Sequence, residues 1–219
     1  VVYKEVSAGI FQRTTERKRP GTVAIAAALK SRYGVAAVPH VICSGFTPSE
    51  LENELIDLSY LGITDLLVLR GDKAKSDRTF IAEQGGYNHA VELCEQVSAF
   101  NSGVMLDGTI HDSLATPFSL GVAGYPEEHE EAMNLDVDIQ HLKAKINAGA
   151  EYVVTQMFFD NAKFFDFVAR CRAAGIEVPI IPGLKPLTSL TQQALLPKTF
   201  HIDLPMELAA ELVKCKSNE

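Results

Sequence analysis

The sequence predicts an α/β protein built on parallel strands, either an open doubly wound sheet or a closed eight-stranded barrel. Helical and strand patterns alternate from about residue 21 onward. The predicted strands are continuous apolar runs, which are typical of parallel strands covered by helices on both faces. Neither G-x-G-x-x-G nor G-x-x-x-x-G-K-[ST] occurs in the chain. Because these are the common nucleotide-binding fingerprints of open sheets, their absence favours the barrel.

The helices and strands are expected in strict alternation. An alanine-rich helix at 21–34 closes at Gly34, and a short buried strand follows at 37–43. Thr47 to Glu50 form a capping box ahead of a helix whose leucines recur at helical spacing. The remaining strands are expected at 66–72, 118–127, 152–160 and 178–184, and the remaining helices at 87–100, 135–149 and 161–175. With about five clear strands, a complete eight-stranded barrel needs more chain than this.

The composition is that of a globular protein and excludes several classes. Hydrophobic residues make up 47% of the 219 positions, and 28 acidic against 20 basic residues give a net charge of -8. That charge argues against nucleic-acid binding, and the basic cluster at 17–19 reads as a solvated face. No apolar run approaches the roughly 20 residues that span a bilayer. The four cysteines form no C-x-x-C pair, which favours a reducing cytoplasm over a zinc site or disulfides.

Four successive predicted strands carry polar residues at their carboxyl ends. Because the carboxyl ends of parallel barrel strands meet at one rim, where active sites are built, we expect these residues to share a pocket. Asp72 could equally be a turn former after Gly71. The residues, strand by strand, are His40; Arg70 and Asp72; Tyr125 and His129; and Gln156.

The helix at 135–149 separates polar from apolar residues. Asp138, His141 and Lys145 are spaced i, i+3, i+7 and share one face, which is either a solvated face or a binding face. The acidic run at 127–132 surrounds a single histidine without the directed ligands of a zinc site, so we expect no metal. No serine or cysteine nucleophile motif occurs. The apolar stripe of this helix is predicted to be Leu135, Ile139, Leu142 and Ile146.

Five stretches follow one another in order along the chain: PHVIC, LGITDLLVLRGD, GVAGYPEEHEEA, LKAKINAGAEYVVTQMFFD and GIEVPIIPGLKP. Together they resemble the methylenetetrahydrofolate reductase family, the flavin-dependent barrel enzymes of one-carbon metabolism. The resemblance implies that residues 1–219 are one (β/α)8 TIM barrel domain that binds FAD noncovalently. It also implies a cytoplasmic homo-oligomer that acts on small-molecule substrates and binds neither nucleic acid nor a membrane. NADH or NADPH would reduce FAD, which would then reduce methylenetetrahydrofolate to methyltetrahydrofolate, in methionine biosynthesis.

The family's site residues carry over where the motifs match. Asp72 is the expected catalytic residue, because its charge near the flavin ring would lower the flavin potential and stabilise a cationic folate. Gln156 and Gln192 are expected to contact the substrate, Gln156 also beside the nicotinamide. Many members have asparagine in place of His141. The expected FAD contacts are His40, Arg70, Gly71, Asp72, Tyr87, Ala123, Tyr125, His129, Asp138, His141 and Lys145.

The sequence also departs from the family pattern. Lys73, Ala74 and Lys75 follow Asp72 where many bacterial members have proline, and the stretch at 106–118 is longer than in compact members. We expect the first two barrel strands, with the family's proton-donating glutamate, and the last strand to be missing from this chain. The alternatives are a non-catalytic flavin- or folate-binding barrel fragment and another barrel flavoenzyme, such as a proline-dehydrogenase-like protein.

Overall fold

The computed structural model describes residues 2–7, 9–14, 19–74, 77–112 and 116–214. Arg17 and Lys18 of the basic cluster, Lys75 and Cys215 lie outside these residues. The chain divides into two compact units. Unit 1 comprises residues 1–121 and 148–150, and unit 2 comprises residues 122–147 and 151–219.

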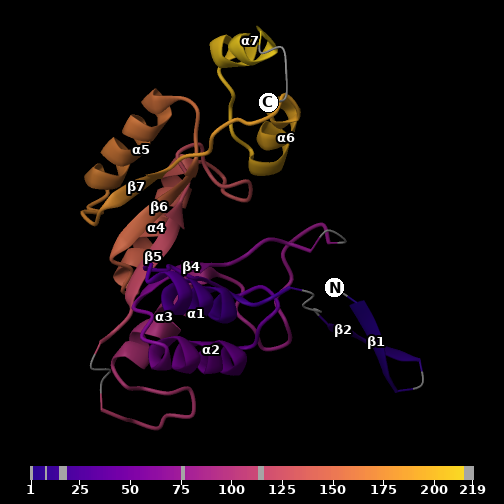
Figure 1. Ribbon diagram of the computed structural model, residues 1–219, viewed down its shortest axis with the longest axis vertical. Coiled ribbons are helices and arrows are strands. Elements are labelled where there is room, and N and C mark those ends of the chain that lie inside the picture. Colours follow the sequence, from indigo (N-terminus) through magenta and orange to yellow (C-terminus); the bar gives the residue numbers. More distant parts are fainter. Residues whose placement is uncertain (1, 8, 15–18, 75–76, 113–115, 215–219) are drawn as a thin grey trace. The chain divides into compact units, whose positions relative to one another are not determined.

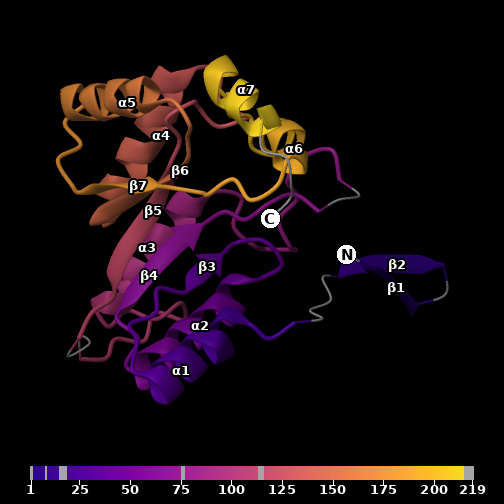
Figure 2. The same cartoon turned by 45° about the horizontal axis from the view of Figure 1, so that its top comes forward.

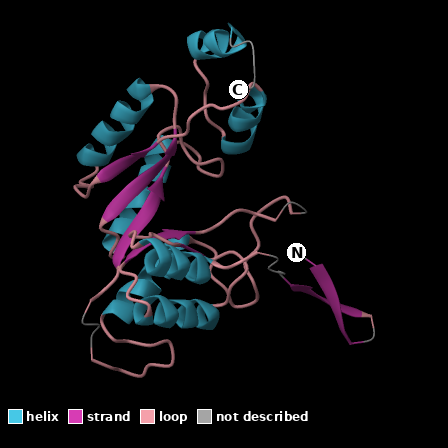
Figure 3. Ribbon diagram, viewed as in Figure 1, coloured by secondary structure: helices cyan, strands magenta, loops and turns pink. Residues whose placement is uncertain are grey.

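Five parallel strands form one sheet in the order β3-β4-β5-β6-β7, which is also their order in the sequence. A helix lies between each of these strands and the next along the chain. Figure 3 draws the helices in cyan and the strands in magenta. The parallel α/β class predicted from the apolar runs is therefore confirmed, and it is consistent with part of an eight-stranded barrel. The strands are β3 (His40–Ile42), β4 (Asp65–Leu69), β5 (Ser119–Gly124), β6 (Tyr152–Met157) and β7 (Ile180–Gly183).

In unit 1 the first two helices begin within a residue of their predicted starts, and the third begins at Ala90, three residues after its predicted start. Thr47 caps the second helix: its Oγ1 accepts a hydrogen bond from the Glu50 N–H at 3.4 Å, and the Thr47 N–H donates to Glu50 Oε2 at 2.8 Å. This reciprocal pair confirms the capping box. Leu51, Leu55 and Leu58 of that helix are fully buried. The helices of this unit are α1 (Thr22–Tyr33), α2 (Pro48–Tyr60) and α3 (Ala90–Asn101).

Unit 1 also contains an antiparallel hairpin, which the sequence reasoning did not foresee. Strand β1 (Val2–Ser7) pairs with β2 (Ile10–Thr14), and Gly9 in the turn has φ 77°. Glycine adopts this left-handed conformation without the steric penalty of a Cβ, so Gly9 was a usable local signal.

In unit 2, β5, β6 and two helices contribute buried side chains. The helices α4 (Leu135–Asn147) and α5 (Asn161–Ala173) lie side by side (Figures 1 and 2). Phe167 of α5 is buried against β5 so closely that a Cβ added at Gly124 would lie 2.9 Å from its ring. The close approach explains why β5 ends in glycine.

Two further helices, α6 (Thr191–Phe200) and α7 (Met206–Lys214), complete unit 2. The sequence analysis predicted no helices there. Pro197 lies inside α6, where proline normally disfavours a helix, and α7 has only 9 residues, so the local signal is weak.

Candidate functional site

In unit 1 the chain turns sharply where β4 ends. Gly71 has φ 84°, and a Cβ added there would lie 2.8 Å from the Ser44 Cβ. The Ser44 N–H donates to the Arg70 carbonyl at 2.9 Å, which draws the two strand ends together. Only glycine fits this turn, because a side chain would meet both backbone strain and a steric clash. Gly71 is one of the expected FAD contacts, and the approach of Ser44 requires a glycine here whether or not a ligand binds.

The charged residues on either side of Gly71 point to different surroundings. The Arg70 guanidinium lies 4.7 Å from the centre of the Phe80 ring, a cation–π contact. The Asp72 side chain is exposed, whereas its carbonyl accepts a hydrogen bond from the Ser44 hydroxyl at 3.3 Å. Sequence reasoning missed Phe80, since nothing in a loop indicates which aromatic ring an arginine will meet.

Tyr87 lies later in the same unit, just before α3, and its ring is half-buried. Burial raises the pKa of its phenol, and the nearby Glu92 carboxylate adds to that shift. The Tyr87 hydroxyl therefore stays protonated near neutral pH and can donate a hydrogen bond.

His40 does not lie at the carboxyl end of its strand, so that part of the prediction is wrong. It is the first residue of β3, is paired with Leu67, and is exposed. The Leu67 N–H donates to the Pro39 carbonyl at 3.0 Å, but Pro39 has no N–H of its own, so the ladder starts only at His40. Ile42, on the same face, lies about 7 Å closer to the carboxyl end.

In unit 2 the first turn of α4 reaches back to the loop that follows β5. Asp138 is buried, and its Oδ2 accepts a hydrogen bond from the His129 N–H at 2.9 Å. Burial raises the pKa of the Asp138 carboxyl, although the His129 N–H and the Lys145 charge act in the opposite direction. The Lys145 ammonium donates to the Ala123 carbonyl of β5 at 2.8 Å.

The polar face of α4 is only partly exposed. His141 is exposed, but Asp138 is buried beside Ile139 and Leu142, so the expected separation from the apolar stripe is wrong for Asp138. A buried carboxylate needs hydrogen bonds to offset its lost hydration, and the His129 N–H supplies one. The face is therefore not a simple solvated surface.

The loop after β5 also orders two rings. The Tyr125 and His129 rings stand edge to face, with centroids 4.8 Å apart. His129 Nδ1 accepts a hydrogen bond from the Glu131 N–H at 3.1 Å, so in the neutral imidazole the proton lies on Nε2. In this tautomer the second ring nitrogen of His129 is a hydrogen-bond donor.

The two predicted substrate contacts both make local hydrogen bonds. Gln156 lies at the carboxyl end of β6, and its Oε1 accepts from the Met157 N–H at 3.0 Å. Gln192 is in the first turn of α6, and its Oε1 accepts from the Thr188 N–H at 2.8 Å. Each amide keeps hydrogen-bonding capacity beyond these contacts.

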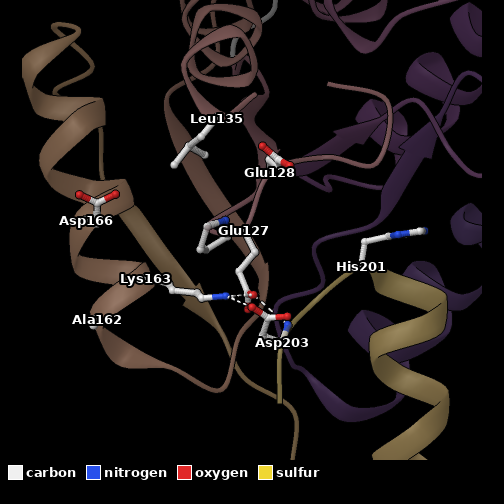
Figure 4. Close-up of a pocket in the computed structure, with 9 residues that line it drawn as sticks. Glu127, Glu128, Leu135, Ala162, Lys163, Asp166, His201 and Asp203 are labelled. Carbon is white, nitrogen blue, oxygen red and sulfur yellow. Dashed lines mark hydrogen bonds and ion pairs between the residues drawn. The ribbon is translucent and has the colours of Figure 1, made fainter. Parts of the chain in front are cut away.

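A pocket of about 620 Å³ in unit 2 contains a group of charged residues that the sequence analysis did not connect. Figure 4 shows Glu127, Lys163 and Asp203 converging from three separate segments. Sequence reasoning had no signal for this group, because its members lie 36 and 76 residues apart. Within the part of the chain that the structure describes, no group of three His, Cys, Asp or Glu residues is placed to hold a metal ion.

The sheet and the polar residues after β4, β5 and β6 define a protein of the parallel β/α-barrel class. The family model for methylenetetrahydrofolate reductase matches residues 6–219, and the chain belongs to this family.

Named relatives agree with this assignment. The chain is 32% identical over 206 residues to 5,10-methylenetetrahydrofolate reductase of Escherichia coli, covering 94% of this chain and 62% of that one. It is 30% identical over 197 residues to methylenetetrahydrofolate reductase 2 of Saccharomyces cerevisiae, covering 89% of this chain and 31% of that one. The chain thus spans less than two thirds of the length of either relative.

A solved structure supports the fold. The protein is an uncharacterized one from Clostridium thermocellum, described as binding two copies of 5-methyl-5,6,7,8-tetrahydrofolic acid. The TM-score is 0.51 at 18% identity, over 87% of this chain and 59% of that one. No helix among the described residues is long and apolar enough to cross a membrane.

Proposed function

We propose that the protein containing this chain reduces 5,10-methylenetetrahydrofolate to 5-methyltetrahydrofolate, with FAD as cofactor and NADH or NADPH as electron donor. The observation that carries the proposal is the family match over residues 6–219, which includes every candidate site residue. The proposal places residues 1–219 in one barrel domain of a cytoplasmic enzyme of one-carbon metabolism and methionine biosynthesis. One relative, in Arabidopsis thaliana, is named "Methylenetetrahydrofolate reductase (NADH) 1", and another, in Caenorhabditis elegans, is named "Probable methylenetetrahydrofolate reductase (NADPH)", so both donors are retained.

The residues present suit FAD. A dinucleotide carries two phosphate charges and ribose hydroxyls, which call for cations, N–H donors and a carboxylate acceptor. In unit 2, Lys145 would provide a cation, His129 an N–H donor and buried Asp138 an acceptor for a hydroxyl. In unit 1, Arg70 would provide a further cation. Bound FAD would supply hydride transfer between nicotinamide and folate.

The chain's own residues would position and stabilise the substrates. The exposed Asp72 carboxylate is available to a folate and would stabilise positive charge on it. Gln156 and Gln192 would orient the substrate through their remaining amide donors and acceptors. In this proposal Gly71 keeps the backbone between Arg70 and Asp72 in the one conformation that presents both side chains.

We also propose a homo-oligomer. Ile25 and Tyr33 of α1 are 50% and 71% exposed, and exposed apolar side chains gathered on one helix are typical of an interface. Sedimentation velocity on the purified protein tests this part separately.

The test of the activity uses the full-length protein reconstituted with FAD. We expect a yellow protein whose flavin is bleached anaerobically by NADH or NADPH and regains its colour when methylenetetrahydrofolate is added. A protein that takes up no FAD would overturn the proposal. Flavin reduction without reoxidation by folate, but with activity on proline, would favour a proline-dehydrogenase-like enzyme instead.

A further inference from the structure

The pocket in unit 2 encloses a buried carboxylate that ties three segments together. Glu127 follows Pro126 in the loop after β5, and its side chain is only 7% exposed. Its Oε2 accepts hydrogen bonds from the Lys163 ammonium at 2.6 Å and from the Asp203 N–H at 2.8 Å. Lys163 lies in the first turn of α5, and Asp203 lies between α6 and α7. Lys163 also forms an ion pair with the Asp203 carboxylate (Figure 4).

The burial makes this group sensitive to the loss of one partner. Glu127 Oε1 is buried without a hydrogen-bond partner among the described residues, so the charge is stabilised through Oε2. Removing the Lys163 ammonium would leave two carboxylates facing each other, one of them buried. An uncompensated buried charge is far more destabilising than the loss of an exposed ion pair.

The residue after Glu127 is held in an unfavourable conformation. Glu128 has φ 66°, in the left-handed region that a residue with a Cβ seldom adopts. Such conformations persist only where the surrounding structure over-determines them. Here anchors lie on both sides, since Glu127 is held by Lys163 and the His129 N–H is held by Asp138.

We propose that Glu127 and Lys163 are positioning residues that hold the loop at 125–129 in the conformation that sets Tyr125 against His129. The part that concerns ligand rests on the proposed function, in which Tyr125 and His129 contact FAD. The loop-holding part stands on the hydrogen bonds alone. Neither Glu127 nor Lys163 touches the flavin in this proposal; both act through the loop.

The experiment uses Lys163→Met in the full-length protein, with Arg170→Met as the matched control. Both substitutions remove a cation from α5 that bridges two acidic residues, but Arg170 lies on the exposed surface and pairs with Asp136 and Asp166. Glu127→Gln is the second variant, and Lys163→Arg tests whether a cation alone restores the loop. Two readouts are taken: amide hydrogen exchange of the peptide covering 122–134 without FAD, and the dissociation constant for FAD.

We expect Lys163→Met and Glu127→Gln to speed exchange in this peptide by about tenfold or more, as local opening becomes easier. Arg170→Met should leave it within about twofold, since exposed ion pairs contribute little. The FAD dissociation constant should rise by about tenfold in the first two variants, together with a changed visible circular dichroism of the bound flavin. Lys163→Arg should recover most of both effects.

Unchanged exchange in Lys163→Met and Glu127→Gln would overturn the proposal, as would equal changes in Arg170→Met. Faster exchange with an unchanged FAD dissociation constant would confine the role of these residues to the fold and overturn the ligand part. If the wild-type protein binds no FAD, the proposed function fails, and the exchange data still decide whether the ion group holds the loop.

Discussion

The loops after β4 and β5 both carry candidate site residues, but they are held in different ways. In unit 1 the turn at Gly71 is set by the backbone, through φ 84° and the contact with Ser44, and the Asp72 side chain is exposed. In unit 2 the loop at 125–129 is held by side chains: Glu127 accepts a hydrogen bond from the Lys163 ammonium, and Asp138 accepts one from the His129 N–H. The Asp72 charge can therefore be removed without disturbing the shape of the first loop, whereas removal of the Glu127 charge should loosen the second loop.

The largest effect that this comparison predicts is a loss of catalytic rate in the Asp72→Asn variant. The folate half-reaction should slow by about 30- to 1,000-fold, or about 2–4 kcal/mol, because one well-placed charge is lost. Flavin reduction by NAD(P)H should suffer less, and the melting temperature should hardly change, because Asp72 is exposed. Stopped-flow absorbance of the flavin measures the two half-reactions separately.

Asp57→Asn is the matched control for Asp72→Asn. It is the same change on the exposed face of α2 in unit 1, and both half-reactions should proceed as in wild type. Equal small effects of the two substitutions would leave Asp72 as a turn former, since asparagine suits turns as well as aspartate does.

Gly71→Ala should test the claim that the backbone holds the first loop. We expect the unfolding free energy to fall by about 2–3 kcal/mol, because strain at positive φ adds to the clash with Ser44. Gly85→Ala is the control, since Gly85 has φ 75° but no atom within 4 Å of an added Cβ. Its loss should be about 1 kcal/mol, and urea unfolding of both variants should separate strain from clash.

Asp138→Asn should reveal how much the buried charge beside the second loop lowers the free energy of unfolding. The pKa of Asp138 is raised in the folded protein. The free energy of unfolding therefore falls as pH rises from about 4, the pKa in the unfolded chain, through the raised folded value. The asparagine variant avoids this cost while its amide oxygen still accepts from the His129 N–H. Relative to wild type, it should therefore gain stability between acidic and neutral pH in urea unfolding.

The exposed neighbour Asp136, whose side chain is 74% exposed, supplies the control for the pH series. Asp136→Asn should follow the wild-type pH profile closely. If Asp138→Asn instead loses stability as pH rises, the His129 and Lys145 contacts outweigh burial, and the carboxylate is a net stabiliser of the loop.

The smallest expected effect is a gain in stability from Glu128→Gly. Glycine adopts φ 66° without strain, and the net gain should be about 0.5–1 kcal/mol after its greater freedom in the unfolded chain is counted. Glu128→Ala keeps the Cβ and should give no such gain. Thermal unfolding of both variants decides whether backbone strain is present in the loop.

Local sequence signals determined helices α1 to α5 and strands β3 to β7 of this protein. The capping box at Thr47, the leucines of α2 and the five apolar runs act over a few residues, and the structure bears them out. Strand ends were predicted less well, because polar residues after β4 and β5 read as part of the strand. His40 illustrates the limit: its position depends on where pairing with β4 begins, which Pro39 decides.

Only the tertiary structure decided which polar groups are buried and what they meet. Spacing placed Asp138 on a polar face of its helix, but it is buried because the loop after β5 offers it a backbone N–H. The partners of Glu127 lie 36 and 76 residues away, and no periodicity in the sequence connects them. Helical and strand patterns come from neighbours in the chain, whereas burial and ion pairing come from segments that meet only after folding, so the sequence alone does not specify them.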